Sequence, residues 1–282
     1  MADLNTLPPL RDVADRHGLR ARRYLGQNFL FDENLLDRIA SFGGDLSNAH
    51  VIEIGPGPGG LTRALLRAGA QRVTALEKDW RCVAALQELS QVSGGRLEII
   101  EGDVLETDLP RLCIQPPVIA GNLPFNIATE VLMQLVESGM LINRMLLMFQ
   151  KEVGHRIAAQ PGSRSYGRLS VLVQWLCTVE TCLEVPAQAF VPAPKVSASV
   201  LCITPRQTPL YPAHIASLRA VTKAAFGQRR KTLRNSLGAA FDDPVKALEA
   251  VGIRPDLRAE KVDIEGFCAL ARLHRGIAEK SL

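Results

Sequence analysis

The segment Gly121-Asn122-Leu123-Pro124-Phe125-Asn126 follows the apolar run 117–120 and combines residue types that suit chemistry on a flat nitrogen base. The exocyclic amine of such a base is a poor nucleophile, because its lone pair is delocalised into the ring. An Asn amide oxygen and a neighbouring backbone carbonyl can orient the amine, and a Phe face can hold the ring by stacking. The segment therefore indicates a site that acts on an exocyclic amine.

A glycine-rich turn lies upstream, in Glu53-Ile54-Gly55-Pro56-Gly57-Pro58-Gly59-Gly60. Glycines let the backbone approach a ligand closely, and the start of the following helix supplies N–H groups. The spacing of Gly55, Gly57 and Gly60 matches the dinucleotide fingerprint, with Glu77 at a suitable distance to bind a ribose hydroxyl. The turn indicates a nucleotide-like ligand, so an NAD-dependent dehydrogenase is one alternative and a plain strand-to-helix turn is another.

Three polar residues, Glu77, Asp103 and Asn122, each stand at the end of a predicted strand. Ligands bind at the carboxyl edge of open parallel sheets, where such residues meet. Each carboxylate alone is more often a helix cap or a loop residue, but the joint placement favours a site. The set fits a nucleoside cofactor, with Glu77 on the ribose hydroxyls and Asp103 on the adenine amine.

The elements that position these residues alternate, and this pattern predicts a doubly wound α/β sheet. Predicted strands cover 51–54, 72–76, 97–100, 118–120 and 145–149, and predicted helices cover 61–67, 80–89 and 127–136. A helix at 169–176 and two strand-like runs, 178–185 and 196–204, follow. After a Pro-rich linker at 204–209, the spacing predicts four helices, 213–226, 232–240, 244–250 and 264–277, in a small C-terminal domain.

Composition indicates a soluble cytoplasmic protein, because the 282 residues are 47% hydrophobic without an apolar run of about eighteen residues or a secretory signal. Six cysteines without zinc-ligand spacing indicate no metal. The net charge of +4 is unevenly spread, with cations gathered in 16–23 and in 229–234. Such patches favour a polyanionic partner, although solvated charged faces are an equal alternative for either patch alone.

The ordered motifs resemble those of class I S-adenosylmethionine-dependent methyltransferases. The resemblance is closer to the small-subunit ribosomal RNA adenine dimethyltransferases, the RsmA/KsgA family. It rests on the segments 25–30 (Leu-Gly-Gln-Asn-Phe-Leu), 53–59, 101–103, 121–126, 166–170, 190–196 and 228–235 (Gln-Arg-Arg-Lys-Thr-Leu-Arg-Asn).

The resemblance implies a mostly parallel, seven-stranded Rossmann-like sheet and two domains. Residues 1–205 would form the S-adenosylmethionine-binding catalytic domain, with 1–48 closing over the cofactor, and 206–282 a helical domain that binds RNA or the ribosome. It implies that the cofactor is bound by Asn28, Leu30, Gly55, Gly57, Glu77, Asp103 and Asn122. Taken without the resemblance, segment 27–30 is more typical of a helix-capping turn.

The resemblance also assigns catalytic roles to Asn122, Leu123, Pro124, Phe125 and Phe190. Asn122 and the Leu123 carbonyl would accept hydrogen bonds from the adenine N6 amine, and Phe125, often Tyr in the family, would stack on the base. Phe190 would cover the other face of the base or form a wall of the pocket, or else be a core Phe before a rigid loop. Ser197 stands where relatives commonly have Asp, with no evident consequence.

The implied partner is small-subunit ribosomal RNA in a pre-30S particle, bound by a monomer without metal or membrane. The expected product is N6,N6-dimethyladenosine at two adjacent adenines in a hairpin loop near the 3′ end of that RNA. Phosphate contacts are expected from seven cations, Arg164, Arg168, Lys195, Arg229, Arg230, Lys231 and Arg234, with the arginines near residue 20. Two alternatives are a large-subunit rRNA methyltransferase of the macrolide-resistance type and a ribosome-assembly or nucleic-acid-binding factor with secondary catalysis.

Overall fold

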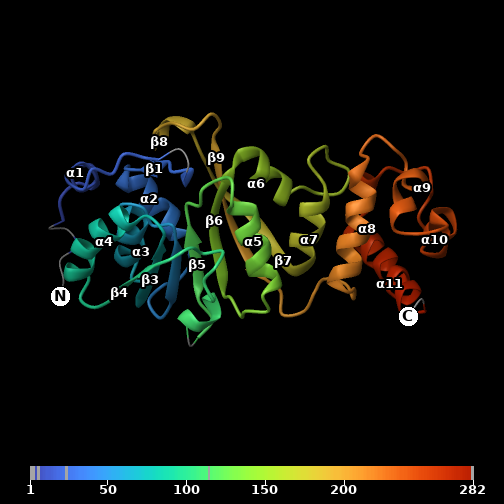
Figure 1. The fold of residues 1–282 in the computed structure, drawn as a ribbon, viewed down its shortest axis with the longest axis horizontal. Helices are drawn as coiled ribbons and strands as arrows, with labels where there is room; N and C mark the ends of the chain where they lie inside the picture. The colour runs from blue at the N-terminus through green and yellow to red at the C-terminus, as the bar shows by residue number, and fades with distance from the viewer. Residues whose placement is uncertain (1–3, 5–6, 23–24, 114, 281–282) are drawn as a thin grey trace. The chain divides into compact units, whose positions relative to one another are not determined.

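The chain folds into two compact units in the computed structural model, which describes residues 4, 7–22, 25–113 and 115–280 (Figure 1). The first unit comprises Met1–Gly154 and Glu180–Pro205, and the second comprises His155–Val179 and Arg206–Leu282. The sequence suggested a single boundary after residue 205. Residues 155–179 group with the C-terminal helices, because α7 (Arg168–Leu176) packs against helices from that part of the chain.

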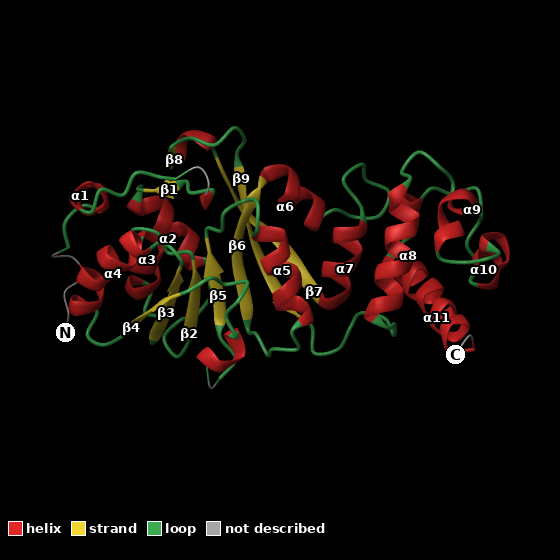
Figure 2. Ribbon diagram, in the orientation of Figure 1, coloured by secondary structure: helices red, strands yellow, loops and turns green. Residues whose placement is uncertain are grey.

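A seven-stranded sheet dominates the first unit (Figure 2). Its strands follow the order β4 (Leu97–Glu101), β3 (Arg72–Glu77), β2 (His50–Ile54), β5 (Val118–Gly121), β6 (Arg144–Gln150), β9 (Ala198–Pro205) and β7 (Cys177–Val185). The five strands from β4 to β6 are parallel, and β9 is antiparallel to β6. The mostly parallel, seven-stranded sheet is therefore confirmed.

Three helices share one hydrophobic core with the sheet: α2 (Glu33–Ser41), α3 (Gly60–Arg67) and α4 (Trp80–Val92). Leu36, Leu65 and Leu86 of these helices lie in the same buried cluster as Val51 and Val73 of the strands. Successive strand residues point to opposite faces, so Ile52, next to Val51, is buried on the other face. The further helices are α5 (Ala128–Glu137), which packs against β6, and α6 (Lys151–Ile157), with a short η3 turn (Leu109–Leu112).

The chain before the sheet carries α1 (Leu10–Arg16) and the two-residue strand β1 (Phe29–Leu30). β1 pairs antiparallel with β8 (Phe190–Val191), which follows the η4 turn (Ala187–Ala189). The helix-capping alternative for 27–30 is wrong, because α2 is capped by Asp32, whose carboxylate accepts from the Leu35 N–H. Segment 25–30 is thereby attached to the distant 190–191 segment.

The second unit is helical around α7, α8 (Ile215–Gly227) and α11 (Ile264–Lys280), which pack against one another. Its other helices are α9 (Leu233–Ser236), η5 (Leu237–Ala239), α10 (Pro244–Ala250) and η6 (Ala259–Lys261). The predicted helix 232–240 is thus divided into α9 and a 3-10 turn, whereas the other three predicted helices are confirmed. Within the described parts of the chain, none of the helices has the length and hydropathy needed to span a bilayer.

Candidate active site

One pocket of the first unit is lined by the segments for which the sequence predicted a role in ligand binding or catalysis. The glycine turn, Glu77, Asp103 and the 121–126 segment all face it, and the N-terminal segment 25–30 completes the wall. The glycine turn follows β2, Glu77 is the last residue of β3, and Asp103 and Asn122 come after β4 and β5, where these parallel strands end. The prediction that Glu77, Asp103 and Asn122 lie together at the carboxyl edge of the sheet is confirmed.

Three glycines shape the turn after β2, since Gly55, Gly57 and Gly59 have φ of 67°, 57° and 93°, a region that favours glycine. A Cβ placed on Gly55 would meet nothing within 4 Å, so the backbone here borders open space in the pocket. A Cβ on Gly57 would lie 3.0 Å from Cε1 of Phe29. The turn therefore leaves room for a ligand beside Gly55, whereas Phe29 of β1 fills the space beside Gly57.

Glu77 is held by backbone donors at the end of β3. Its Oε2 accepts from the Gly57 N–H at 2.9 Å, and its Oε1 accepts from the Asp79 N–H at 2.8 Å. Burial raises the pKa of Glu77, although these hydrogen bonds act in the opposite direction. Since a carboxylate has about four lone-pair sites, the Glu77 carboxylate keeps capacity for a hydroxyl donor. Glu77 is thus both a brace for the glycine turn and an acceptor toward the pocket.

Sequence reasoning missed Glu53, which lies in β2 before the turn and also lines the pocket. Its side chain is 1% exposed, and Oε2 has no hydrogen-bond partner among the described residues. Burial raises its pKa to about 8. Burying a carboxylate in an apolar strand costs free energy of folding unless the group is paired or hydrogen-bonded. The presence of Glu53 within an otherwise apolar predicted strand was therefore the sequence signal that could have identified it. A buried polar atom without a partner at the pocket wall is consistent with a ligand group there.

Asp103 lies beyond β4 and forms an ion pair with Lys78, with Nζ at 2.6 Å from Oδ2. Its Oδ1 accepts from the Leu105 N–H at 3.0 Å. The Lys78 hydrogen bond holds the pKa of Asp103 below its usual value. Asp103 is therefore an ionised acceptor at the pocket wall, and Lys78 is a neighbour that the sequence did not single out.

The Asn122 side chain reaches back to the N-terminal segment, where its Nδ2 donates to the Asn28 carbonyl at 3.1 Å. The Asn28 amide in turn donates to the Gly26 carbonyl at 3.1 Å. Among the described residues, none donates a hydrogen bond to Oδ1 of Asn122. The preceding Gly121 is required here, because a Cβ would lie 2.7 Å from the Ile54 carbonyl oxygen. Asn122 therefore keeps an acceptor available in the pocket.

The remaining predicted catalytic residues separate into two groups. Leu123, Pro124 and Phe125 line the pocket, with Leu123 buried and Phe125 partly exposed. Phe190 is not among the pocket-lining residues, because it is 2% exposed and packs in the hydrophobic core with Leu30, its partner across β1 and β8. This core position fits the alternative of a core Phe, and the expected role of Phe190 over the base stays a prediction.

Six of the seven predicted phosphate-binding cations belong to the second unit and are exposed: Arg164, Arg168, Arg229, Arg230, Lys231 and Arg234. Arg229 has a local role as well, since its Nη2 donates to the carbonyls of Arg164 at 2.7 Å and Tyr166 at 3.1 Å. The exposed Lys195 belongs to the first unit, so the structure does not bring all seven together in one unit.

Near residue 20, Arg16 pairs with Glu88 at 2.9 Å, and Arg23 lies outside the described residues. The described residues contain no cluster of three or more His, Cys, Asp or Glu side chains suited to a metal ion.

The sequence matches one protein family over most of its length. The model of the family described as ribosomal RNA adenine dimethylase matches residues 18–275. A protein of Rhodospirillum rubrum named ribosomal RNA small subunit methyltransferase A is 54% identical over 266 residues, covering 94% of this chain and 92% of the relative. A protein of the same name from Paramagnetospirillum magneticum is 52% identical over 275 residues, covering 96% and 95%.

Solved structures support the fold. A dimethyladenosine transferase from Plasmodium falciparum aligns with a TM-score of 0.77 and 24% identity, covering 89% of this chain and 98% of that one. The 23S rRNA methyltransferase ErmE aligns with a TM-score of 0.68 and 24% identity, covering 87% and 98%. At this level of identity, these similarities establish a shared methyltransferase fold and no more.

Proposed function

The chain belongs to the ribosomal RNA adenine dimethylase family, and from that premise we propose that it dimethylates small-subunit ribosomal RNA. It is an S-adenosylmethionine-dependent enzyme that forms N6,N6-dimethyladenosine at two adjacent adenines in a hairpin loop near the 3′ end of this RNA. The observation that carries the proposal is that Glu77, Asp103, Asn122 and Phe125 all line the same pocket.

The pocket fits S-adenosylmethionine on three observations. Open space borders the Gly55 backbone, Glu77 and Asp103 present acceptors, and the buried Oε2 of Glu53 lacks a hydrogen-bond partner among the described residues. Glu77 would accept from the ribose hydroxyls, and Asp103 would accept from the adenine amine. The turn at Gly55 and Gly57 would border the rest of the cofactor, which Asn28 and Leu30 would cover.

Bound S-adenosylmethionine supplies an electrophilic methyl group whose C–S bond breaks as the N–C bond to adenine forms. The residues of the chain orient the amine for that step. Asn122 Oδ1 and the Leu123 carbonyl accept the two N6 hydrogens, so that the lone pair points at the methyl carbon. Phe125 stacks on the ring, and Pro124 stiffens the segment between them. The proton leaves after transfer, when the methylated amine has become acidic.

The RNA partner is held by charge outside the pocket. The exposed cations of the second unit, with Lys195 of the first, neutralise phosphates without reading sequence, so RNA shape selects the target and the pocket selects adenine. We place the enzyme, as a cytoplasmic monomer, on a pre-30S particle. In this assignment residues 1–205 carry catalysis and 206–282 bind RNA or the ribosome, with 155–179 packing against the second group.

The proposal is tested by incubating under-methylated small subunits and, in a parallel reaction, large subunits with labelled cofactor and analysing the rRNA nucleosides of each by mass spectrometry. We expect labelled N6,N6-dimethyladenosine with the wild type and a large loss with Asn122→Ala. If only large-subunit RNA is labelled, the macrolide-resistance type of activity is correct instead. If Asn122→Ala methylates at the wild-type rate, the assigned site is wrong, and if neither protein methylates any subunit, a binding factor is the better description.

A further inference from the structure

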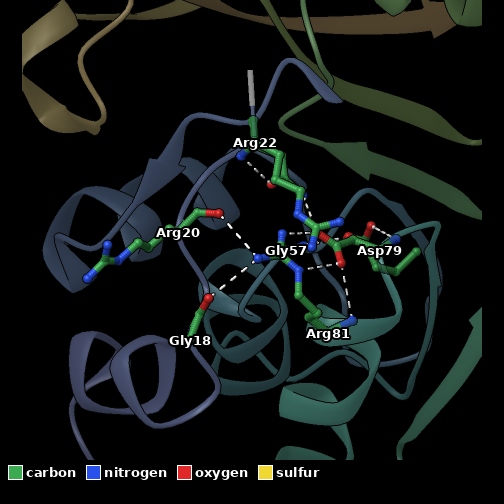
Figure 3. A network of polar contacts seen from close by, with 8 residues as sticks. Gly18, Arg20, Arg22, Gly57, Asp79 and Arg81 are labelled. Atoms are coloured by element: carbon green, nitrogen blue, oxygen red, sulfur yellow. Dashed lines mark hydrogen bonds and ion pairs between the residues drawn. The ribbon is translucent and has the colours of Figure 1, made fainter. Parts of the chain in front are cut away.

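A buried polar network joins the N-terminal segment to the start of α4 (Figure 3). Its centre is Asp79, whose side chain is 1% exposed. Arg81 binds both of its carboxylate oxygens, with Nη2 at 2.6 Å from Oδ2 and Nε at 3.0 Å from Oδ1. Gln27 donates from Nε2 to Oδ2 at 2.9 Å. A charged group this deep is stable only when its acceptors are satisfied, so the network has a defined geometry.

The orientation of the Gln27 amide is set at both ends. Oε1 accepts from the Arg22 N–H at 3.0 Å, which leaves Nε2 directed at Asp79. Arg81 adds longer contacts, since its Nη1 lies 3.4 Å from the carbonyls of Gly18 and Arg20 (Figure 3). The segment before the first pocket residue is therefore held by side chains of the 79–81 turn.

The network lies on a continuous path from the cofactor side of the pocket to the methyl-acceptor side. Glu77 accepts from the Asp79 N–H at 2.8 Å, and Asp79 binds Gln27. The next residue, Asn28, accepts from Nδ2 of Asn122 at 3.1 Å. Each step is a hydrogen bond or a peptide bond. Gln27 is thus directly connected to the residue whose backbone carbonyl binds the Asn122 amide.

We propose that Gln27 and Asp79 are positioning residues, which hold the Asn28 carbonyl and through it keep Oδ1 of Asn122 directed at the adenine amine. This inference rests on the proposed function of the pocket. If the Asn28 carbonyl shifts, the Asn122 amide loses the restraint that selects its oxygen for the substrate. A misplacement of about 1 Å can lower a rate by about 10²-fold, so the effect falls on turnover more than on cofactor binding.

The test uses two single variants of the full chain and their combination. Gln27→Glu sets a second carboxylate against Asp79, and Asp79→Asn turns one acceptor into a donor that faces the Gln27 donor. The combination of Gln27→Glu with Asp79→Asn restores one hydrogen bond with its direction reversed. The matched control is Glu88→Gln, which removes the negative charge from the contacts of Glu88 with Arg16 (2.9 Å) and His17 (2.7 Å), a separate attachment of the N-terminal segment to α4.

Two quantities are measured: kcat on under-methylated small subunits and the dissociation constant of S-adenosylhomocysteine. We expect each single variant to lower kcat by about tenfold or more while the dissociation constant changes by less than about threefold. The double variant should recover part of the lost kcat, and Glu88→Gln should match the wild type.

Equal losses in kcat and in S-adenosylhomocysteine affinity, or a double variant no better than Gln27→Glu, would overturn the positioning role. If kcat of both single variants equals that of the wild type, the inference fails while the proposed function stands. An inactive wild type would contradict the proposed function itself, and S-adenosylhomocysteine binding by every variant shows that the fold is retained.

Discussion

The side-chain amide of Asn122 donates to the backbone carbonyl of Asn28 at 3.1 Å, across a separation of 94 residues. The carbonyl can only accept, so it engages Nδ2 and leaves Oδ1 as the free end of the amide. The N-terminal segment thus decides which atom of Asn122 the substrate meets. This contact makes the chemistry of the 121–126 segment depend on residues near the start of the chain.

Asn122→Asp should lower kcat by about 10²-fold, because a carboxylate cannot donate to the Asn28 carbonyl and would be repelled by it. S-adenosylhomocysteine affinity should change much less. The control is Asn143→Asp, which removes a similar amide-to-carbonyl hydrogen bond, 2.9 Å to Pro116, away from the pocket. Single-turnover methylation of small subunits gives the comparison, and equal rates for the two variants would rule out the assigned role.

Gly121→Ala should destabilise the fold by about 1 to 3 kcal/mol, because strands β2 and β5 would have to separate. The new Cβ would lie 2.7 Å from the backbone oxygen of Ile54, which cannot move alone. Gly238→Ala is the matched control, since a Cβ there meets nothing within 4 Å. Urea unfolding should show a lower midpoint for Gly121→Ala only. If the urea unfolding curves of the two variants coincide, the close approach of Gly121 to the Ile54 carbonyl oxygen is contradicted.

Glu53→Gln should change how stability depends on pH. Burial raises the pKa of Glu53 from 4.5 to about 8, so between these values the folded state binds more protons than the unfolded state. The contribution of Glu53 to the free energy of unfolding is therefore fully present below pH 4.5 and is lost as the pH rises to about 8. The slope in that window reaches at most about 1.4 kcal/mol per pH unit.

The wild type should accordingly lose stability relative to Glu53→Gln as pH rises through this window. Urea unfolding of both proteins at several pH values measures the difference. Parallel curves for the two proteins would show that Glu53 titrates normally in the folded state.

Glu77→Gln should weaken S-adenosylhomocysteine binding by about tenfold or more, because its amide group would place a donor against the N–H of Gly57 or Asp79. Glu101→Gln is the control, since Glu101 pairs with Glu77 in the sheet register but is exposed. Thermal-shift titration reports the affinity. In the wild type, S-adenosylhomocysteine should raise Tm and NAD should not; the reverse pattern would favour the dehydrogenase alternative.

Replacing Arg230 and Lys231 together by Ala should weaken binding to under-methylated small subunits, because both exposed cations are expected to contact phosphates. The slope of log affinity against log salt should fall by roughly 0.7 to 0.9 per lost contact. Arg254→Ala removes an exposed cation of the same unit that pairs with Asp256 at 3.3 Å, and it should leave the slope unchanged. An unchanged slope in the double variant would exclude these cations from the RNA contact.

The strands and the ligand-binding edge were predictable because buried parallel strands appear as continuous apolar runs. Once β3, β4 and β5 were recognised, the positions of Glu77, Asp103 and Asn122 followed, since the ends of parallel strands share one edge. The pairing of β1 with β8 was not predictable, because two residues have no periodicity to detect. The burial of Phe190 follows from that pairing.

By itself, the amino-acid sequence determined the α/β class, the positions of the main strands along the chain, the family and the residues at the strand ends. The tertiary structure alone decided that Phe190 packs in the core, that Oε2 of Glu53 is buried without a hydrogen-bond partner among the described residues, and that Gln27 reaches Asp79. Propensity and periodicity are local properties of a chain. A hydrogen bond between distant residues depends on side-chain direction within a few tenths of an ångström, which exists only once the elements have packed.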